Sequence, residues 1–398
     1  MPSIASHPIT PLSTPDTLPS PSALNAYVWR QILLTLLVQS VFPLGFTLSL
    51  YLGNPLLLVW CVFVLFPVLD LILPQDNWNP QSKQEAKLLE NDKRFLIPLY
   101  AVFVSDLAIF WYALKMAESG NLRIYDFVML AFMTAQSSAA NAGVGHELYH
   151  RRNKFHKVIG TISYVKFYYS HMTVAHVKFH HKIVATPQDP TTSRMGESLY
   201  AYLLRGITGS FLEVYSLNKD GFSEGLRHLN YYVCLFVGIF LSIGLKAALF
   251  SLLSGFLCMI MIETVNYVEH YGLQRKLIDG VYELVNIRHS WNAPQVVTNF
   301  MLFKLQRHSD HHANAYKPYQ ILESLPESPQ LPHGYSASLI LAMIPSVWFA
   351  VADPLAKAAN NNEKVDDKIL KEVNNRAYSV LIPSFILMTV ATFYLPYA

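Results

Sequence analysis

The sequence predicts an all-α integral membrane protein built as a six-span transmembrane helix bundle. Hydrophobic residues make up 52% of the 398 residues, whereas charged residues make up only 14%, and the mean hydropathy is +0.26. A composition this apolar is typical of multi-span membrane proteins rather than of soluble domains. Long apolar runs recur along the chain, and a helix of such length crosses a hydrocarbon core of ~30 Å.

Six apolar runs predict the six spans, and the last two form a hairpin. The runs are residues 28–51, 54–74, 95–117 and 121–144, and the two arms of 229–270. A shorter run at 336–352 is interrupted by Pro345, which predicts a re-entrant or interfacial element. A final run at 377–396 predicts an extra C-terminal hydrophobic helix.

The same pattern divides the chain into three segments. Residues 1–26 are rich in Pro, Ser and Thr and can bury little apolar surface, so we expect a disordered tail. Residues 27–355 form the membrane-embedded domain, and residues 356–398 hold a polar linker and the extra hydrophobic helix.

Basic residues predict the orientation in the membrane. Four lie in 75–94, eleven in 145–230 and six in 271–335. Because cytosolic loops are enriched in Lys and Arg, these regions should face the cytosol, at the endoplasmic reticulum if the protein is eukaryotic or at the inner membrane if it is bacterial. The net charge of +3 gives no indication of a nucleic-acid partner, and the three cysteines lie in apolar runs, which argues against a disulfide framework.

Nine of the fifteen histidines form four clusters with helical spacing, all in the regions expected to face the cytosol. Residues three or four apart share one face of a helix, and imidazoles on one face can bind a metal ion, so several clusters together could enclose more than one ion. The nine are His146, His150, His176, His180, His181, His270, His308, His311 and His312.

Two other metal-dependent functions fit part of this pattern. The segment from His146 to His150 has the His-Glu-x-x-His spacing of a zinc-dependent membrane protease, with Glu147 as the base, but it leaves the other clusters unexplained. A histidine-lined metal transporter would place its ligands near the bilayer midplane, whereas these histidines lie at the cytosolic edge and beyond.

The longer motifs around the histidines carry a family resemblance. They read HELYHR, HHKIVATPQDPTTSRMGES, NYVEHYGL, HSWN, LQRHSDHHA and QLPHGY. The chain resembles the membrane-bound alkane 1-monooxygenase (alkane hydroxylase) family of the membrane fatty-acid desaturase and hydroxylase superfamily from about residue 50 to residue 355.

The resemblance implies a cytosol-facing, non-haem di-iron site held by the nine histidines. It further implies hydroxylation of an unactivated, terminal C–H of a medium- or long-chain alkane or alkyl lipid with O₂ and two electrons. A separate rubredoxin- or ferredoxin-type donor with its reductase would supply the electrons, because the chain has no dinucleotide fingerprint and no Cys₄ cluster. Desaturation, or hydroxylation of a fatty acid or another hydrophobic metabolite, stays open as an alternative.

Acidic residues beside the clusters are candidates for orienting the rings. A site built from histidine needs carboxylates behind the ligands to fix each tautomer and to offset the metal charge. The candidates are Glu147, Asp189, Glu269 and Asp310. Glu263 lies on the same predicted helix face as His270, which also favours a role at the site.

Three positions depart from the family pattern, namely Arg151, Ala175 and Phe179. A bulky ring at Phe179, next to two of the histidines, is expected to shape the substrate space, so these departures bear on substrate identity. An alkane-like substrate must be selected by shape inside an apolar channel. Trp60, in the second expected span, is a candidate for limiting the depth of that channel.

Overall fold

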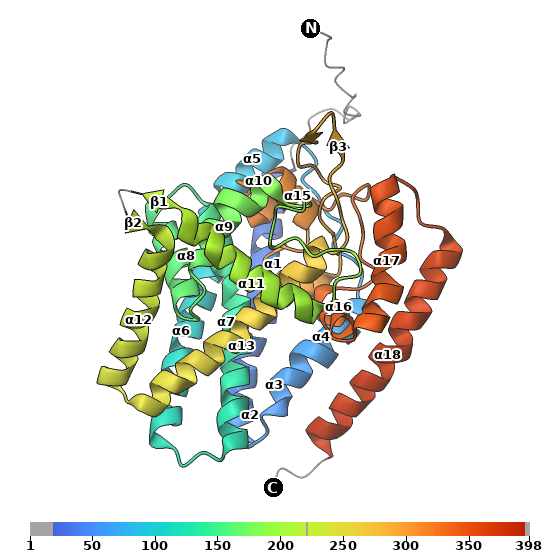
Figure 1. Ribbon diagram of the computed structural model, residues 1–398. Helices are drawn as coiled ribbons and strands as arrows, with labels where there is room; N and C mark the ends of the chain where they lie inside the picture. The colour runs from blue at the N-terminus through green and yellow to red at the C-terminus, as the bar shows by residue number, and fades with distance from the viewer. Residues whose placement is uncertain (1–18, 220–221, 395–398) are drawn as a thin grey trace.

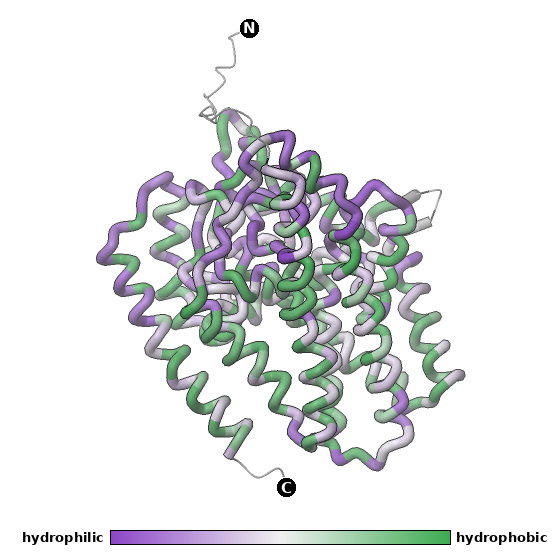
Figure 2. Tube along the Cα trace, turned by 180° about the vertical axis from the view of Figure 1, so that it is seen from behind, coloured by the Kyte–Doolittle hydropathy of each residue, from purple (hydrophilic) through white to green (hydrophobic). Residues whose placement is uncertain are grey.

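The computed structural model describes residues 19–219 and 222–394, which form a bundle of α-helices with a compact cap at one end (Figure 1). Hydrophilic residues gather in this cap and hydrophobic residues follow the helices away from it (Figure 2). The short segments α9, α10 and α15 lie in the cap, so the histidine clusters they carry sit at the polar end of the bundle. The apolar and polar regions therefore separate as the sequence predicts.

The N-terminal third is almost wholly helical. Its elements are α1 (Pro21–Gln39), α2 (Val41–Tyr51), α3 (Leu56–Trp60), the π-helix η1 (Cys61–Leu65), α4 (Phe66–Ile72), α5 (Lys83–Asn91), the 3₁₀-helix η2 (Lys93–Phe95), α6 (Leu96–Ser119) and α7 (Ile124–His150). The expected tail ends earlier than predicted, because Pro21 starts α1 and the Ser20 hydroxyl accepts a hydrogen bond from the Ala23 amide. Residues 1–18 of that tail lie outside the described residues.

The middle third contains most of the cap and the helical hairpin. Its elements are α8 (Lys154–Val165), α9 (His171–Ala175), the π-helix η3 (His176–His180), α10 (His181–Ile183), α11 (Leu199–Ser216), β1 (Asn218–Lys219), β2 (Phe222–Ser223), α12 (Glu224–Ser242) and α13 (Leu245–His270). β1 and β2 pair antiparallel. The expected hairpin over 229–270 is confirmed as α12 and α13, which turn at Ile243 and Gly244.

The C-terminal third closes the cap and adds a long helix. Its elements are β3 (Leu277–Ile278), β4 (Val281–Tyr282), α14 (Val296–Met301), α15 (His308–Ala313), the 3₁₀-helix η4 (Tyr319–Ile321), α16 (Tyr335–Ala342), α17 (Pro345–Asn361) and α18 (Asp367–Phe393). β3 and β4 form a second antiparallel pair. The break expected at Pro345 separates α16 from α17, and the expected C-terminal helix begins ten residues before Ala377.

Four helical segments among the described residues are long and apolar enough to cross a membrane. They are Pro21–Tyr51, Lys93–Ser119, Leu245–His270 and Asp367–Phe393. The second expected span is a shorter apolar helix, Leu56–Ile72, and the two remaining ones are the helices α7 and α12. The number of six spans stays a prediction.

Helix α7 packs against α6, α8 and α13 and carries two of the histidines into the cap. Its contact with α8 depends on glycine, because a Cβ atom on Gly160 would lie 2.7 Å from the Gly145 carbonyl oxygen. A Cβ atom on Gly145 would in turn meet the Tyr164 ring at 2.8 Å. Small residues that let helix backbones approach are typical of packing in lipid. The pair fixes the helix turn just before His146.

A buried ion pair strengthens the contact of α7 with α8 about one turn before Gly145. Lys166, at the end of α8, pairs with Asp106 of α6, and Asn141 of α7 donates to the same carboxylate at 2.7 Å. Ser137 and Ser138 are also within hydrogen-bond distance of this carboxylate. An acid is costly within a membrane helix unless it is paired. Asp106 therefore ties α6, α7 and α8 together.

Candidate metal centre

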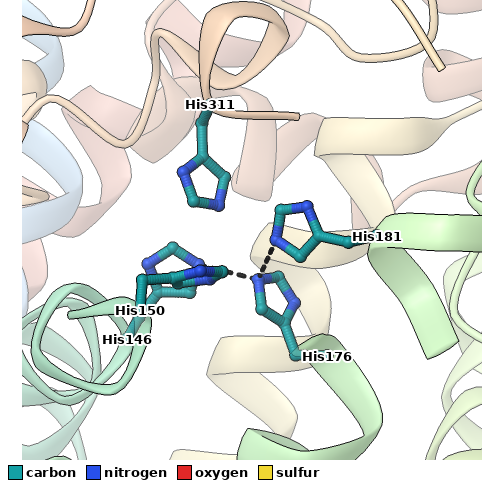
Figure 3. A group of neighbouring side chains, drawn as sticks. All are labelled: His146, His150, His176, His181 and His311. Carbon is teal, nitrogen blue, oxygen red and sulfur yellow. Dashed lines mark hydrogen bonds between the residues drawn. The ribbon is translucent and has the colours of Figure 1, made fainter. Parts of the chain in front are cut away.

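The nine histidines converge in two adjoining groups. The first group consists of His146, His150, His176, His181 and His311, and their ligand atoms all lie within 4.8 Å of one another (Figure 3). The rings come from α7, η3, α10 and α15 and point toward a common centre. Segments far apart in the sequence therefore supply one five-imidazole array.

The second group contains the other four histidines and one carboxylate. His180, His270 and His312 form one set within 4.8 Å, and Glu269, His270 and His308 form an overlapping set. His270 belongs to both sets, so we treat the five residues as one group. All of them are buried.

The π-helix η3 changes how the histidines are grouped. The sequence spacing suggested that His176 and His180 act together on one helix face, but His180 lies in the second group with His270. In a π-helix the turn closes over five residues, which brings His181 to the same side as His176. Likewise, the neighbours His311 and His312 point to different groups because successive residues of a helix are about 100° apart.

The arrangement fits metal ions better than hydrogen bonding alone. The Nε2 atoms of His146 and His176 lie 2.8 Å apart, and those of His308 and His312 lie 3.0 Å apart. Each such pair has one proton to share, whereas a cation would use the lone pairs of both rings. Nε2 of His311 is buried and has no hydrogen-bond partner among residues 19–219 and 222–394.

Burial keeps these imidazoles neutral. Loss of water around His311 and His312 lowers the pKa of each ring well below its usual value, and the neighbouring histidines lower it further. A neutral ring offers a free lone pair, which is the form that binds a metal. Histidine nitrogen suits iron, zinc and copper. The residues present therefore fit a metal site of this kind.

Asp189 orients one ring of the second group. Its Oδ2 atom lies 2.7 Å from Nδ1 of His180, and it also accepts hydrogen bonds from Thr191 and Thr192. Burial alone would raise the pKa of Asp189, but the contact with His180 and these hydrogen bonds lower it to about 2. An ionised Asp189 keeps the Nδ1 proton of His180 in place and turns Nε2 toward the group.

Glu269 has a different position from the one expected for an orienting carboxylate. Its Oε2 atom lies 3.4 Å from Nε2 of His308, on the side of the ring that faces the group rather than behind it. Glu263 lies further back, where its two oxygens accept hydrogen bonds of 2.7 Å from the hydroxyls of Tyr169 and Tyr202. Glu269 is therefore placed as a candidate ligand.

Glu147 and Asp310 face away from the rings. Glu147 pairs with Arg151 at 2.8 Å and accepts a hydrogen bond from the Tyr319 amide. Asp310 pairs with Lys317 at 2.7 Å and accepts from the amide of Glu323 at the same distance. Both carboxylates anchor cap segments that follow the last histidine cluster.

Sequence reasoning missed the ion pair that positions His308. The buried Arg307 pairs with Asp76 at 3.1 Å, donates to the Asp76 carbonyl at 2.9 Å and also donates to the Leu322 carbonyl. Asn292 holds the next residue, because its Oδ1 accepts from the Ser309 hydroxyl at 2.7 Å. The motif LQRHSDHHA contains Arg307, but its partner lies more than 200 residues away.

An apolar cavity of about 1080 Å³, counting its open mouth, reaches both groups. Its lining includes His146, His150 and His176 from the first group, and His308 and Glu269 from the second. The rest of the lining is mostly apolar and comes from α2, η1, α7, α8, α9, α13, α14, α16 and the segment that follows α14. Such a cavity suits a hydrophobic molecule.

The two channel candidates lie elsewhere. Neither Trp60 nor Phe179 is among the described residues that line the cavity. Trp60 donates its indole N–H to the Thr389 hydroxyl of α18 at 2.9 Å and stacks edge-on against Phe393. Val62 and Phe63, which follow Trp60 closely in the sequence, line the cavity instead.

Comparisons with known proteins show the family to which the chain belongs. The model of the family "Fatty acid desaturase" matches residues 125–338. Alkane 1-monooxygenase 1 of Pseudomonas aeruginosa is 34% identical over 85% of this chain and 94% of its own length. Alkane 1-monooxygenase of Ectopseudomonas oleovorans is 31% identical over 85% and 87%. The xylene/toluene monooxygenase hydroxylase component of Pseudomonas putida is 25% identical over 74% and 81%.

Together, the apolar helices, the histidine groups and the cavity are those of an integral membrane oxidoreductase with a histidine-rich site for metal. The match to the family model contains the segment from His146 to His312, and the similarity to the two alkane 1-monooxygenases covers most of this chain and of each relative. The chain belongs to the alkane 1-monooxygenase family.

Proposed function

We propose that this protein is a non-haem di-iron monooxygenase that hydroxylates an unactivated, terminal C–H of a medium- or long-chain alkyl substrate. One atom of O₂ enters the C–H bond, and the other leaves as water with two electrons and two protons. The observation that carries the proposal is the pair of histidine groups at the end of an apolar cavity. The family of alkane 1-monooxygenases supports the same reaction.

In this proposal the nine histidines and Glu269 hold two iron ions, one in each group. Bound iron supplies the oxygen activation that amino-acid side chains cannot provide. Asp189 keeps His180 in one tautomer, and Arg307 holds the segment that carries His308. The apolar lining binds the alkyl chain, aligns its end with the histidines and excludes water.

The orientation and the electron donor follow from charge. We infer six spans and a cytosol-facing cap, because the basic residues are concentrated in 145–230 and 271–335. A rubredoxin- or ferredoxin-type donor, being acidic, would be steered to this side. Turnover that depends on the donor should therefore fall as salt rises, because screening shortens to ~8 Å at physiological strength. Salt-independent turnover would leave the basic residues with a topological role alone.

Desaturation is the second candidate, because residues 125–338 match the fatty acid desaturase family. A product assay on the purified protein with alkanes and fatty acyl substrates separates the two. Hydroxylation adds the mass of one oxygen atom, whereas desaturation removes two hydrogens. We expect a product that contains one additional oxygen atom, and this atom should be ¹⁸O when the assay is run under ¹⁸O₂. A dehydrogenated product without oxygen would contradict the monooxygenase assignment.

A further inference from the structure

One polar side chain in the apolar cavity is left unpaired. Gln136 of α7 lines the cavity and is 3% exposed, and both atoms of its amide lack hydrogen-bond partners among the described residues. A buried amide without a partner is unfavourable, so a native structure that keeps one calls for an explanation. Gln136 has no part in the metal site or in helix packing as described above.

The polar residues beside Gln136 have a different role. Ser137, Ser138 and Asn141 face the other side of α7, where all three contact the Asp106 carboxylate. Gln136 faces the cavity together with Ala139, Ala140, Gly143 and His146. This spacing of three and four residues is one face of a helix. The polar stretch of α7 is therefore two-sided, and its cavity side has an unused donor and an unused acceptor.

The position of Gln136 defines a length. It precedes His146 by ten residues of the same helix, which corresponds to ~15 Å along the axis. The residues between them on this face are Ala139, Ala140 and Gly143, whose small side chains leave a groove along α7. A chain lying in the groove would have one end at the histidines and the other end at the amide of Gln136.

The chemistry of the lining restricts the polar group that fits there. The amide both donates and accepts, so a hydroxyl, an ester or another carbonyl group can pair with it. A carboxylate is disfavoured, since the described lining contains no Lys or Arg and a charge buried without a partner is costly. A buried water would need two to four polar partners, and this part of the groove offers mainly alanine and glycine surface. Ser336 of α16 also lines the cavity, and its hydroxyl likewise has no hydrogen-bond partner among the described residues.

We propose that Gln136 recognises a neutral polar group at the far end of the substrate, so that the substrate is an alkyl chain with a hydroxyl or carbonyl function rather than a plain alkane. This inference rests on the proposed function for the orientation of the chain, with its unsubstituted end at the histidines. Gln136 is a specificity-determining residue in this account and takes no part in the oxidation itself.

The test uses ligand binding as well as turnover, so that the two proposals fail separately. Purified full-length protein is given an alkane or the primary alcohol with the same carbon number, and the ligand-induced rise in melting temperature and kcat/KM are measured. We expect about tenfold stronger binding of the alcohol, the value of one neutral hydrogen bond. Gln136→Leu should remove that preference and should melt higher without ligand, because it loses the unpaired amide.

Gln39→Leu is the matched control. Gln39 is also a buried glutamine, but it donates to the Met301 carbonyl and lies outside the lining, so this variant should keep the preference for the alcohol. Equal binding of alkane and alcohol, or a preference that survives in Gln136→Leu, would overturn the inference. Binding that prefers the alcohol without any oxygenated product would instead contradict the proposed reaction and leave the ligand class intact.

Discussion

The two histidine groups differ in their surroundings although they lie side by side. In the second group, Asp189 contacts His180 and Glu269 contacts His308. In the first group, no carboxylate among the described residues is paired with any of the five rings, and the array consists of imidazole alone. Carboxylates fix tautomers and offset metal charge. In the second group Asp189 therefore orients His180 and Glu269 adds a negative charge, whereas the rings of the first group depend on the helices that carry them.

The largest expected effect comes from removing one ring of either group. His311→Ala and His312→Ala form a matched pair, because these neighbours point to different groups. Each should lower turnover by more than ~10²-fold, since a missing ligand is expected to matter at least as much as a missing partner behind a ligand. Each variant should also lose a different one of the two iron environments in Mössbauer spectra. His156→Ala, outside both groups, should keep both environments; loss of the same environment in both variants would contradict the separation.

A smaller effect is expected from the carboxylate that orients the second group. Asp189→Asn should weaken iron binding there by ~10–100-fold and leave the first group loaded, because the mutated amide no longer fixes the Nδ1 proton of His180. Iron retention during dialysis against a chelator measures this. Glu147→Gln is the control: Glu147 adjoins His146 in the sequence but contacts Arg151 and Tyr319, so it should lower the melting temperature without this selective loss. Equal iron loss in both variants would show that Asp189 has no special role.

The smallest effect concerns the helix packing under the first group. Gly160→Ala forces α8 away from α7, because the new methyl group would meet the Gly145 carbonyl oxygen. We expect a loss of ~1–3 kcal/mol in stability, as is usual for overpacking, and weaker iron binding in the first group. Thermal unfolding and Mössbauer spectra measure the two effects. Unchanged stability would show that α7 and α8 can accommodate the added methyl group, and would contradict the close contact between Gly160 and Gly145.

Much of the fold and of the candidate site could be predicted from the sequence, but the division of the histidines into two groups could not. Helical spacing groups His146 with His150, His176 with His180, and His308 with His311 and His312, because it follows from local periodicity. The full set of nine, with His181 and His270, came from the family resemblance. The π-helix η3 places His180 in a different group from His176. The spacing of the histidines in the sequence does not predict that this turn is a π-helix. Asp189 could be named as a candidate because it lies only nine residues after His180.

Contacts between residues far apart in the sequence could not be predicted either. Asp76 meets Arg307, and the Trp60 indole meets Thr389, in each case across more than 200 residues. One sequence contains no signal that pairs such positions, so Trp60 was expected in the channel although it packs against α18. Gln136 lies among several small and polar residues of α7, and only the contacts separate its cavity side from the side that holds Asp106.

The central claim is that the two groups hold one iron ion each, and the metal content of the purified protein tests it most directly. Elemental analysis alongside a turnover assay should give close to two irons per chain in active protein, with activity lost when the iron is removed and regained when it is restored. Stoichiometric zinc without iron in protein that is active as isolated would contradict the account.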